Sequence, residues 1–374
     1  MTKTQPTIFV LGFGSIGALL AAQLQKRAQA NVIPLLRSKQ RLAEFQKYEY
    51  KAKIRSIFKE GHPELVATFP NASCPDLMPS ECKIDNLIIT TKTYQTKEAM
   101  APYMKYIHPD TNIILVQNGL GVFEVLQEEV FLDFSPNLFQ GVISHGAFHD
   151  TGFTFNHAGF ADLKIARLPV GKNSDIVQSL SLVREDAENN ELMKAFCEPQ
   201  FVESLAVKHL TYQEMLLGQL EKFLVNACIN PITSIVDCIN GELKTIAGPI
   251  FESIITEALA VLKIAYKPLF DYTPKNSDFP ALDVTGTLDA SRMLEFIIRI
   301  GCIVNDDNSS SMRQDVLNLR DTEIQYINGF IVRLCEKLGL PSEQCKVNQT
   351  VETLVNLRLG LNRTRDQFGD KRKK

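Results

Sequence analysis

The first part of the chain alternates short apolar runs with longer amphipathic segments. Four continuous apolar runs predict buried strands at residues 7–11, 31–36, 86–91 and 111–117. Continuous apolar strands that alternate with helix-like segments are typical of a parallel sheet covered on both faces. Between residues 138 and 168 apolar and polar positions alternate, which indicates an antiparallel extension or an edge of that sheet. Residues 171–195 are polar and charged, and predict an insertion on the surface.

From about residue 209 onward the strand pattern is replaced by apolar positions spaced at the helical period. This spacing predicts helices at 212–230, 248–266, 290–305 and 319–340. A Pro- and Asp-rich segment at 267–283 predicts an exposed loop. The length of 374 residues favours two domains. We therefore expect an α/β domain over residues 1–205 and an all-helical domain over residues 206–374.

Composition narrows the class of protein. Hydrophobic residues make up 45% and charged residues 22%, as in a soluble globular protein, and the net charge of −3 does not favour nucleic-acid binding. The N-terminus does not resemble a signal peptide, and no apolar run approaches the roughly 18 residues of a membrane helix. The eight cysteines are scattered without a CxxC pair, which predicts reduced thiols, no metal site and a cytoplasmic protein.

A glycine-rich turn follows the first predicted strand and opens a predicted helix. It reads G-x-G-x-x-G, and comprises Gly12, Phe13, Gly14, Ser15, Ile16 and Gly17. In this context the first glycine permits a tight turn, the second allows the backbone to approach a pyrophosphate, and the third allows close packing of helix and strand. The helix N-terminus would supply N–H groups to the phosphates. The turn therefore predicts a dinucleotide site in a Rossmann-type domain.

Polar residues also follow the other predicted strands. Arg37 follows the second strand, where an NAD-specific site would carry Asp or Glu, and no carboxylate stands there in the sequence. A guanidinium suits a 2′-phosphate, so we expect NADP(H). Lys92 and Asn118 follow the third and fourth strands. Because the carboxyl ends of parallel strands share one edge, we expect all of these residues to line one crevice.

A predicted helix in the second half carries an unexpected polar stripe. Lys222, Asn226 and Asn230 recur every four residues between apolar neighbours, so they stack on one side of the helix. A solvated edge would explain this stripe, and so would a binding site. Reduction of a ketone leaves negative charge on its oxygen, and a protonated lysine can both stabilise that charge and donate a proton.

Taken together, these motifs resemble the ketopantoate reductase family, and most closely its fungal members. The matching segments occur in family order and span most of the chain: GFGSIG at 12–17, LRS at 36–38, TTKTYQTKEA at 90–99, QNGLG at 117–121, K-x3-N-x3-NP at 222–231, NGEL at 240–243, and SSSMRQD…RDTEIQYING at 309–329. The resemblance implies a Rossmann-type NADP-binding domain followed by an all-α domain like the C-terminal domain of 6-phosphogluconate dehydrogenase. Segments 50–82, 171–195 and 266–284 lie outside the shared pattern.

The resemblance also implies a role for individual residues. Lys222 corresponds to the general acid of the family, and Glu323 to a glutamate that contacts a substrate hydroxyl near it. NADPH would be bound by the glycine turn, Arg37, Lys92 and Asn118. The substrate would be bound by Lys222 and Glu323 together with Asn118, Asn226, Asn230, Asn308 and Ser311.

The expected activity is the NADPH-dependent reduction of 2-dehydropantoate (ketopantoate) to (R)-pantoate, in pantothenate and coenzyme A synthesis. Two alternatives stay open: another NADP-dependent 2-oxo-acid or β-hydroxyacid dehydrogenase on the same scaffold, and a non-catalytic NADPH-sensing protein. As an enzyme, the protein is expected to act on a small molecule, as a monomer or homodimer, and without a metal.

Overall fold

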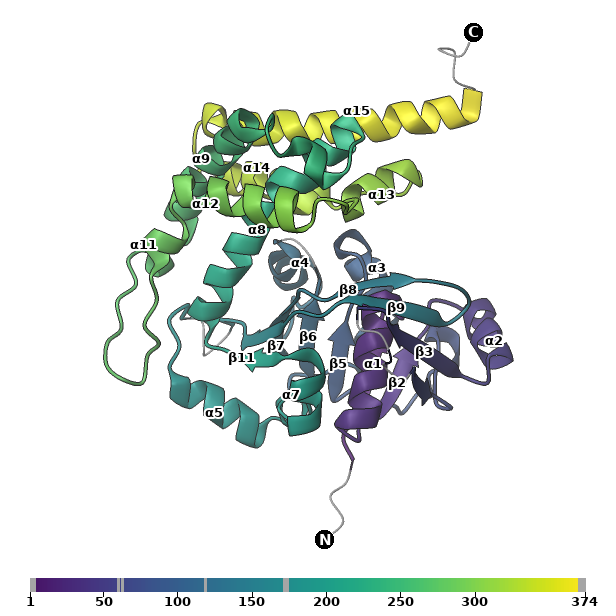
Figure 1. Ribbon diagram of the computed structural model, residues 1–374. Coiled ribbons are helices and arrows are strands. Elements are labelled where there is room, and N and C mark those ends of the chain that lie inside the picture. Colours follow the sequence, from purple (N-terminus) through teal and green to yellow (C-terminus); the bar gives the residue numbers. More distant parts are fainter. Residues whose placement is uncertain (1–4, 59–60, 62–63, 118–119, 171–174, 369–374) are drawn as a thin grey trace. The chain divides into compact units, whose positions relative to one another are not determined.

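The computed structural model describes residues 5–58, 61, 64–117, 120–170 and 175–368 (Figure 1). The chain forms two compact units. Unit 1 comprises Met1–Asn118, Phe123–Met215 and Lys275–Pro280, and unit 2 comprises Gly119–Val122, Leu216–Pro274 and Ala281–Lys374. The main division therefore falls inside one long helix, α8 (Tyr212–Val236), and two short segments belong to the unit opposite to their flanking sequence.

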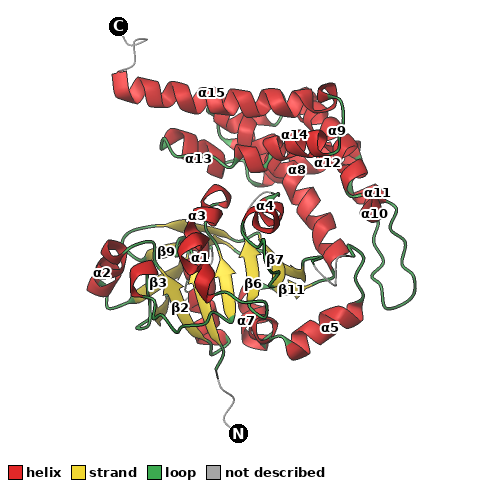
Figure 2. Ribbon diagram, turned by 180° about the vertical axis from the view of Figure 1, so that it is seen from behind, coloured by secondary structure: helices red, strands yellow, loops and turns green. Residues whose placement is uncertain are grey.

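Unit 1 is built on a seven-stranded sheet of order β11-β10-β7-β6-β5-β1-β2 (Figure 2). Its strands are β1 (Thr7–Leu11), β2 (Asn31–Leu35), β5 (Asn86–Ile89), β6 (Asn112–Val116), β7 (Asn137–Ile143), β10 (Leu163–Arg167) and β11 (Val207–His209). The four strands predicted from continuous apolar runs are β2, β1, β5 and β6, and they are parallel neighbours. The predicted antiparallel extension is also present, because β10 runs antiparallel to β7.

A second sheet, of order β4-β3-β9-β8, was not expected from the sequence. It contains β3 (Lys51–Ser56), β4 (Leu65–Thr68), β8 (Gly146–His149) and β9 (Thr154–Gly159). Helix α1 (Ser15–Arg27) packs against strands of both sheets, so it is apolar and buried along most of its length. The glycine turn, residues 12–17, therefore opens a helix that is held from two sides.

An aromatic cluster anchors the glycine turn to this core. The ring of Phe13 lies 5.4 Å from that of Phe45 and 5.5 Å from that of Phe69, with Phe153 and Phe155 slightly further away. Such tilted and edge-on pairs stabilise beyond the burial of their apolar area. The cluster joins the turn to the second sheet, which supplies Phe155.

The remaining helices of unit 1 correct one prediction. They are α2 (Lys39–Lys47), η1 (Pro75–Leu77), η2 (Thr93–Gln95), α3 (Thr96–Met100), η3 (Ala101–Tyr106), α4 (Val122–Glu129), α5 (Leu180–Asn189), α6 (Glu191–Phe196) and α7 (Pro199–Leu205). Residues 171–195 were expected to be a surface insertion, but α6 buries Leu192, Met193 and Phe196 in the core. Asp186 of α5 also pairs with Arg167 of β10, and both side chains are largely buried. The polar residues of this segment are therefore partly structural.

Unit 2 is helical, as predicted. Besides the second part of α8 it contains η5 (Asn240–Leu243), α9 (Gly248–Ala265), α10 (Lys267–Phe270), α11 (Val284–Thr287), α12 (Ala290–Ile297), the π-helical η6 (Ile298–Val304), α13 (Ser311–Leu317), η7 (Ile324–Tyr326), α14 (Asn328–Lys337), η8 (Ser342–Cys345) and α15 (Lys346–Phe368). The helix expected at 290–305 divides into α12 and η6. The helix expected at 319–340 is wrong in its first part, since regular α-helix begins only at Asn328.

The Pro- and Asp-rich loop is anchored at its middle. The carboxylate of Asp278 accepts hydrogen bonds from the main-chain N–H of Ser181, from its hydroxyl and from Arg184, all in α5. These hydrogen bonds join residues 275–280 to α5, and both segments belong to unit 1. The loop expected at 267–283 is wrong at its start, where Lys267–Phe270 form α10. The rest of the loop is present, with a fixed contact that the sequence did not indicate.

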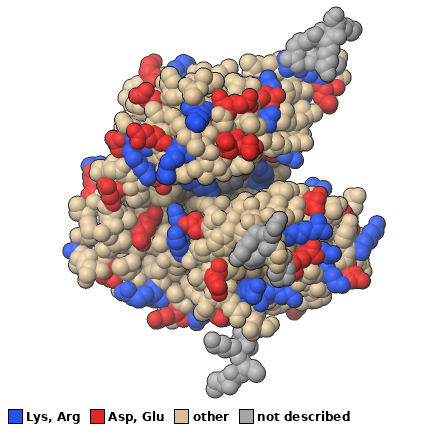
Figure 3. All heavy atoms as spheres, viewed as in Figure 1, with Lys and Arg blue, Asp and Glu red and all other residues tan. Residues whose placement is uncertain are grey.

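The surface agrees with a chain of small net charge. On the face shown in Figure 3, cationic and anionic side chains are interspersed on each unit. None of the described helices combines the length and the apolar character that crossing a membrane requires. All eight cysteines have free thiols, as expected.

Two buried histidines form a polar contact at the second sheet. The Nε2 of His145 donates to the carbonyl oxygen of Leu205 at 2.9 Å, which leaves Nδ1 of the neutral ring as an acceptor. That atom lies 2.9 Å from Nε2 of His157, so His157 donates to it. Burial lowers the pKa of His145, and burial with the neighbouring His145 lowers the pKa of His157 to about 4.

We expect acid to destabilise the protein through this pair. Both histidines have a pKa in the folded state below that of the unfolded state, so the unfolded chain binds protons first as the pH falls. The stability is complete above about pH 6.5 and is lost toward about pH 4; His157 alone contributes about 2 kcal/mol between pH 6.5 and 5. The unfolding temperature should fall over this range, and less so in His157→Gln. The exposed His149, changed to Gln, is the control, and a pH-independent unfolding temperature would contradict the prediction.

Candidate functional site

Each glycine of the glycine turn meets a different geometric requirement. Gly12 has a φ of +98°, in the left-handed region that glycine adopts readily. A Cβ on Gly17 would lie 1.9 Å from the carbonyl oxygen of Gly12, so α1 can approach the turn only if this position has no side chain. Around Gly14, in contrast, nothing lies within 4 Å of where a Cβ would stand. Close packing explains Gly12 and Gly17, and does not explain Gly14.

The space at Gly14 fits the pyrophosphate of a dinucleotide. Gly14 is the N-cap of α1, and it contributes no side-chain cap to the first turn, which also contains no acidic residue. The N–H groups at the start of the helix, including those of Ser15 and Ile16, therefore lack a side-chain acceptor of the usual capping kind. Such groups, with the positive end of the helix dipole, bind phosphate.

Two residues of the predicted cofactor site have side chains that belong to the core. Phe13 and Ile16 are partly buried and pack against the hydrophobic core of unit 1. A bound cofactor would therefore contact the main chain of these two residues. Their side chains hold the turn in place.

Threonines and a glutamine connect the strand ends around the turn. Thr90 Oγ1 donates to the carbonyl oxygen of Gly12, and a Cβ on Gly12 would lie 2.7 Å from the main-chain nitrogen of Thr91. Gln117 Nε2 donates to the carbonyl oxygen of Thr91 at 2.7 Å and also to Thr96 Oγ1. The ends of β1, β5 and β6 are thus fixed to one another. Thr90, Thr91, Thr96 and Gln117 lie in the motifs at 90–99 and 117–121, but the sequence predicts functional roles only for their neighbours Lys92 and Asn118.

Those neighbours are Lys92 and Asn118. Lys92 is half-buried and precedes η2 directly. Asn118 lies outside the described residues. Immediately after it the chain enters unit 2, where the N–H of Leu120 donates to the carbonyl oxygen of Tyr326 at 3.0 Å. Gly121 follows with a φ of +94°, so the second glycine of QNGLG also meets a backbone requirement.

Arg37 is exposed at the end of β2, as predicted, and the structure adds two facts about its surroundings. Ser38 caps α2, since its hydroxyl accepts from the N–H of Arg41 at 3.2 Å. Lys39 pairs with Asp76 at 3.6 Å. In the folded chain a carboxylate, that of Asp76, thus approaches Lys39, although none follows this strand in the sequence. The charge of Asp76 is offset by Lys39, while Arg37 makes no ion pair with any described residue.

The polar stripe of Lys222, Asn226 and Asn230 lies on α8, in its part that belongs to unit 2. All three residues are half-buried. The helix buries five of the six residues between them, namely Phe223, Leu224, Ala227, Cys228 and Ile229, and Val225 is half-buried. The stripe is thus less exposed than a solvated edge would be.

A run of three serines meets the end of this helix. Within it, Ser310 is buried and its hydroxyl lies 2.7 Å from that of Thr233 in α8. Ser310 also caps α13 by accepting from the N–H of Arg313. Thr233 Oγ1 also lies 3.1 Å from the carbonyl oxygen of Asn230, which precedes it by about one helical turn. Thr233 therefore links the main chain of Asn230 to the serine run, Ser309–Ser311, in which Ser311 is exposed.

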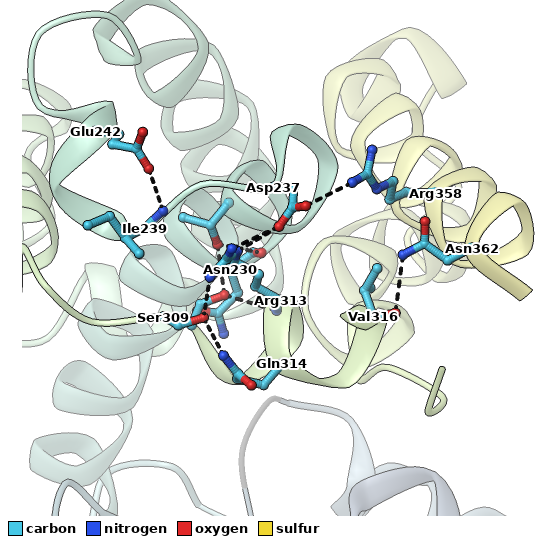
Figure 4. Close-up of polar contacts among 12 residues, drawn as sticks. Asn230, Asp237, Ile239, Glu242, Ser309, Arg313, Gln314, Val316, Arg358 and Asn362 are labelled. Atoms are coloured by element: carbon cyan, nitrogen blue, oxygen red, sulfur yellow. Dashed lines mark hydrogen bonds and ion pairs between the residues drawn. The ribbon is translucent and has the colours of Figure 1, made fainter. Parts of the chain in front are cut away.

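Arg313 fixes the serine run from the other side. Its Nη1 donates to Ser309 Oγ at 2.9 Å, and its Nε donates to the carboxylate of Asp237 at 2.9 Å. Asp237, just beyond the end of α8, also pairs with Arg358 of α15 at 3.3 Å (Figure 4). This triad of Arg313, Asp237 and Arg358 could not be predicted from the sequence, because its members are far apart along the chain. Two guanidinium groups on one carboxylate leave a net positive charge beside the serines.

The other predicted site residues of unit 2 differ in exposure. Glu323 is only 7% exposed and lies at the start of η7. Asn308 is exposed, and its side chain donates to that of Asn305 at 2.9 Å. Its main-chain oxygen accepts from the N–H of Asn240 at 3.0 Å, so the NGEL turn holds the segment that leads into the serine run.

Comparisons with known proteins identify relatives of this chain. Residues 8–169 match the family described as ketopantoate reductase PanE/ApbA, and residues 214–358 match its C-terminal domain. The chain is 51% identical over 98% of its own length, and 98% of the relative's, to the 2-dehydropantoate 2-reductase of Saccharomyces cerevisiae. It is 40% identical to a probable 2-dehydropantoate 2-reductase of Schizosaccharomyces pombe, over 96% of this chain and 98% of that protein.

The fold is shared more widely than the sequence. D-mandelate dehydrogenase, solved with NADH and anilino(oxo)acetate, has a TM-score of 0.69 at 18% identity, over 96% of this chain and 99% of that one. The two family matches together cover most of both units, and the relatives match nearly end to end. The chain therefore belongs to the ketopantoate reductase PanE/ApbA family.

Proposed function

We propose that the protein reduces 2-dehydropantoate to (R)-pantoate with NADPH, in pantothenate and coenzyme A synthesis. The observation that carries the proposal is its identity to the budding-yeast reductase, which extends over nearly all of both chains. The glycine turn, the half-buried polar stripe and the adjacent serine run provide the groups that this reaction needs.

A nicotinamide cofactor, when bound, supplies the hydride for the ketone carbon. The electron pair of the C=O bond then moves to the oxygen, which needs a proton. Lys222 donates that proton: an N–H bond breaks, an O–H bond forms, and the ammonium becomes an amine. Asn226 and Asn230 can hold the substrate's polar groups without adding charge, and Glu323 orients Lys222.

The serine run is suited to the substrate's carboxylate. Ser311 is exposed, and would donate its hydroxyl hydrogen to a carboxylate oxygen. The positive charge left by Arg313 and Arg358 on Asp237 favours an anion nearby. This combination favours a 2-oxo acid over an uncharged ketone.

Arg37 should determine the choice of cofactor. A 2′-phosphate carries nearly two negative charges, and one charge-assisted hydrogen bond to it contributes about 1.5–3 kcal/mol. Arg37→Ala should therefore raise KM for NADPH by roughly ten- to a hundredfold, and leave the weak activity with NADH nearly unchanged. The preference for NADPH should also decrease as salt is added.

The control for Arg37 is Arg27→Ala, which removes the same charge from an exposed position at the C-terminal end of α1, away from the glycine turn. It should leave KM for NADPH unchanged. Equal losses with NADPH and NADH in Arg37→Ala, or efficient use of NADH by the unmodified protein, would contradict the assignment of Arg37.

The reaction itself is tested by following NADPH consumption by the purified protein with a panel of 2-oxo acids. We expect 2-dehydropantoate to have the highest kcat/KM. A higher value for another 2-oxo acid would favour a different dehydrogenase on the same scaffold. No turnover with any of them, together with tight NADPH binding, would favour a cofactor-sensing protein.

A further inference from the structure

Helix α8 contains a proline, Pro231, directly after the last residue of the polar stripe. Proline has no N–H, so the carbonyl oxygen four residues earlier, that of Ala227, loses its helical partner. Ala227 is fully buried. A buried carbonyl without a donor destabilises the folded protein.

The missing donor comes from another helix. Asn328, the first residue of α14 and fully buried, donates from Nδ2 to the carbonyl oxygen of Ala227 at 3.2 Å. The same Nδ2 donates to Asn348 Oδ1 at 3.0 Å. Because a carbonyl can only accept, this contact fixes the orientation of the Asn328 amide. The Oδ1 of Asn328 has no hydrogen-bond partner within the described part of the chain, so the residue serves here as a donor.

The amide of Asn348 is fixed in turn. Its Nδ2 donates to Glu257 Oε2 at 2.7 Å, and the same carboxylate accepts from the main-chain N–H groups of Val347 and Asn348. The carbonyl of Ala227 and the carboxylate of Glu257 can only accept hydrogen bonds, so the orientations of both amide groups are fixed. Asn328 is thus held by α15 and α9 as it reaches α8.

On the other side of the proline, hydroxyl groups hold the last turn of α8. Thr233 Oγ1 donates to the carbonyl oxygen of Ile229 at 2.7 Å, and Ser234 Oγ donates to that of Asn230 at 2.6 Å. Hydroxyl groups that bond back in this way bend helices. Since the hydrogen of Thr233 is used, Ser310 donates to Thr233. The part of α8 that contains Pro231 is therefore connected directly to the serine run.

We propose that α8 bends at Pro231 and that Asn328 is a positioning residue, which fixes this bend and so keeps Asn230 at the serine run. Pro231 has no N–H to donate to the carbonyl oxygen of Ala227, and Asn328 donates the hydrogen bond in its place. Lys222 and Asn226 precede Ala227 in α8, and Asn230 lies between Ala227 and Pro231. The inference rests on the proposed function, which gives Asn230 and the serine run their roles at the substrate.

The first test is Pro231→Ala. Alanine restores an N–H for the carbonyl of Ala227 and removes the ring, so α8 straightens and Asn230 moves away from the serine run. KM for 2-dehydropantoate should rise about tenfold or more. KM for NADPH should change less than about twofold, and the unfolding temperature should be kept or raised, because alanine favours helix over proline. The control is Pro249→Ala, at the exposed start of α9, where no carbonyl is opened.

The second test is a double-mutant cycle with Asn328→Leu, read by the unfolding temperature. Alone, this change leaves the carbonyl of Ala227 without a donor and should lower the unfolding temperature by roughly 2–10 °C. In the Pro231→Ala background the loss should be clearly smaller, because the new N–H serves Ala227.

The outcomes separate the two claims. A folded Pro231→Ala protein with the KM for 2-dehydropantoate of the unmodified protein would overturn the positioning role. Additive losses of unfolding temperature would overturn the assignment of Asn328 as the donor for Ala227. An unmodified protein that reduces no 2-oxo acid would overturn the proposed function instead, while the thermal cycle would still report on the contact.

Discussion

Replacing Lys222 by alanine will lower kcat by about two to four orders of magnitude, while NADPH binding stays nearly unchanged. Hydride transfer to the ketone carbon does not require Lys222. The ketone oxygen, which becomes negatively charged in this step, requires a proton from it. Water is a weaker acid than an ammonium group, and it is not held by the half-buried stripe in which Lys222 lies. The loss should appear in kcat, because the proton is transferred after both ligands are bound.

Two measurements make this prediction specific. The dissociation constant for NADPH, measured without substrate, should match that of the unmodified protein. Lys263→Ala removes an exposed lysine from α9 of the same unit and should leave kcat unchanged. If a folded Lys222→Ala protein turns over at a near-normal rate, Lys222 is not the acid.

The main sheet could be predicted from the sequence because its central strands are buried on both faces. Continuous apolar runs such as that of β1 have no other explanation in a chain of this composition. The second sheet could not be predicted, since its parallel pair joins Lys53 in β3 to Thr154 in β9, which are far apart along the chain. Its strands are short and half-exposed, so their apolar pattern is weak.

The site was predictable where one segment carries the whole signal. The spacing of Lys222, Asn226 and Asn230 is a property of one helix, and the glycine turn is a property of one loop. Residues that act through a distant partner left no such pattern: Asp76 reaches Lys39, and Asn328 reaches α8, only in the folded chain. The helix predicted at 212–230 stops before Pro231, whereas α8 continues to Val236. A proline inside a helix requires another donor for the carbonyl four residues earlier, and the predicted end of the helix hid this signal.

Gly14 and Gly17 should respond in opposite ways to the same substitution. In Gly17→Ala the new Cβ would lie 1.9 Å from the carbonyl oxygen of Gly12, so helix and turn must separate. We expect a large loss of unfolding temperature and of soluble protein, since overpacking costs about 1–3 kcal/mol or more. This effect should appear with or without a cofactor.

Gly14→Ala should leave the fold intact and remove cofactor binding. The backbone of Gly14 is extended, with φ −89°, and no atom lies within 4 Å of the new methyl group. The methyl group would instead occupy the space that we assign to the pyrophosphate, so the dissociation constant for NADPH should rise at least about tenfold, at an unchanged unfolding temperature. Gly360→Ala is the matched control, because this glycine also has nothing within 4 Å but lies in α15 of unit 2. Gly360→Ala should not raise the dissociation constant for NADPH, and it should not lower the unfolding temperature, since alanine favours helix. If Gly14→Ala binds NADPH as tightly as Gly360→Ala does, the pyrophosphate does not lie at the glycine turn, and the open space at Gly14 has another cause.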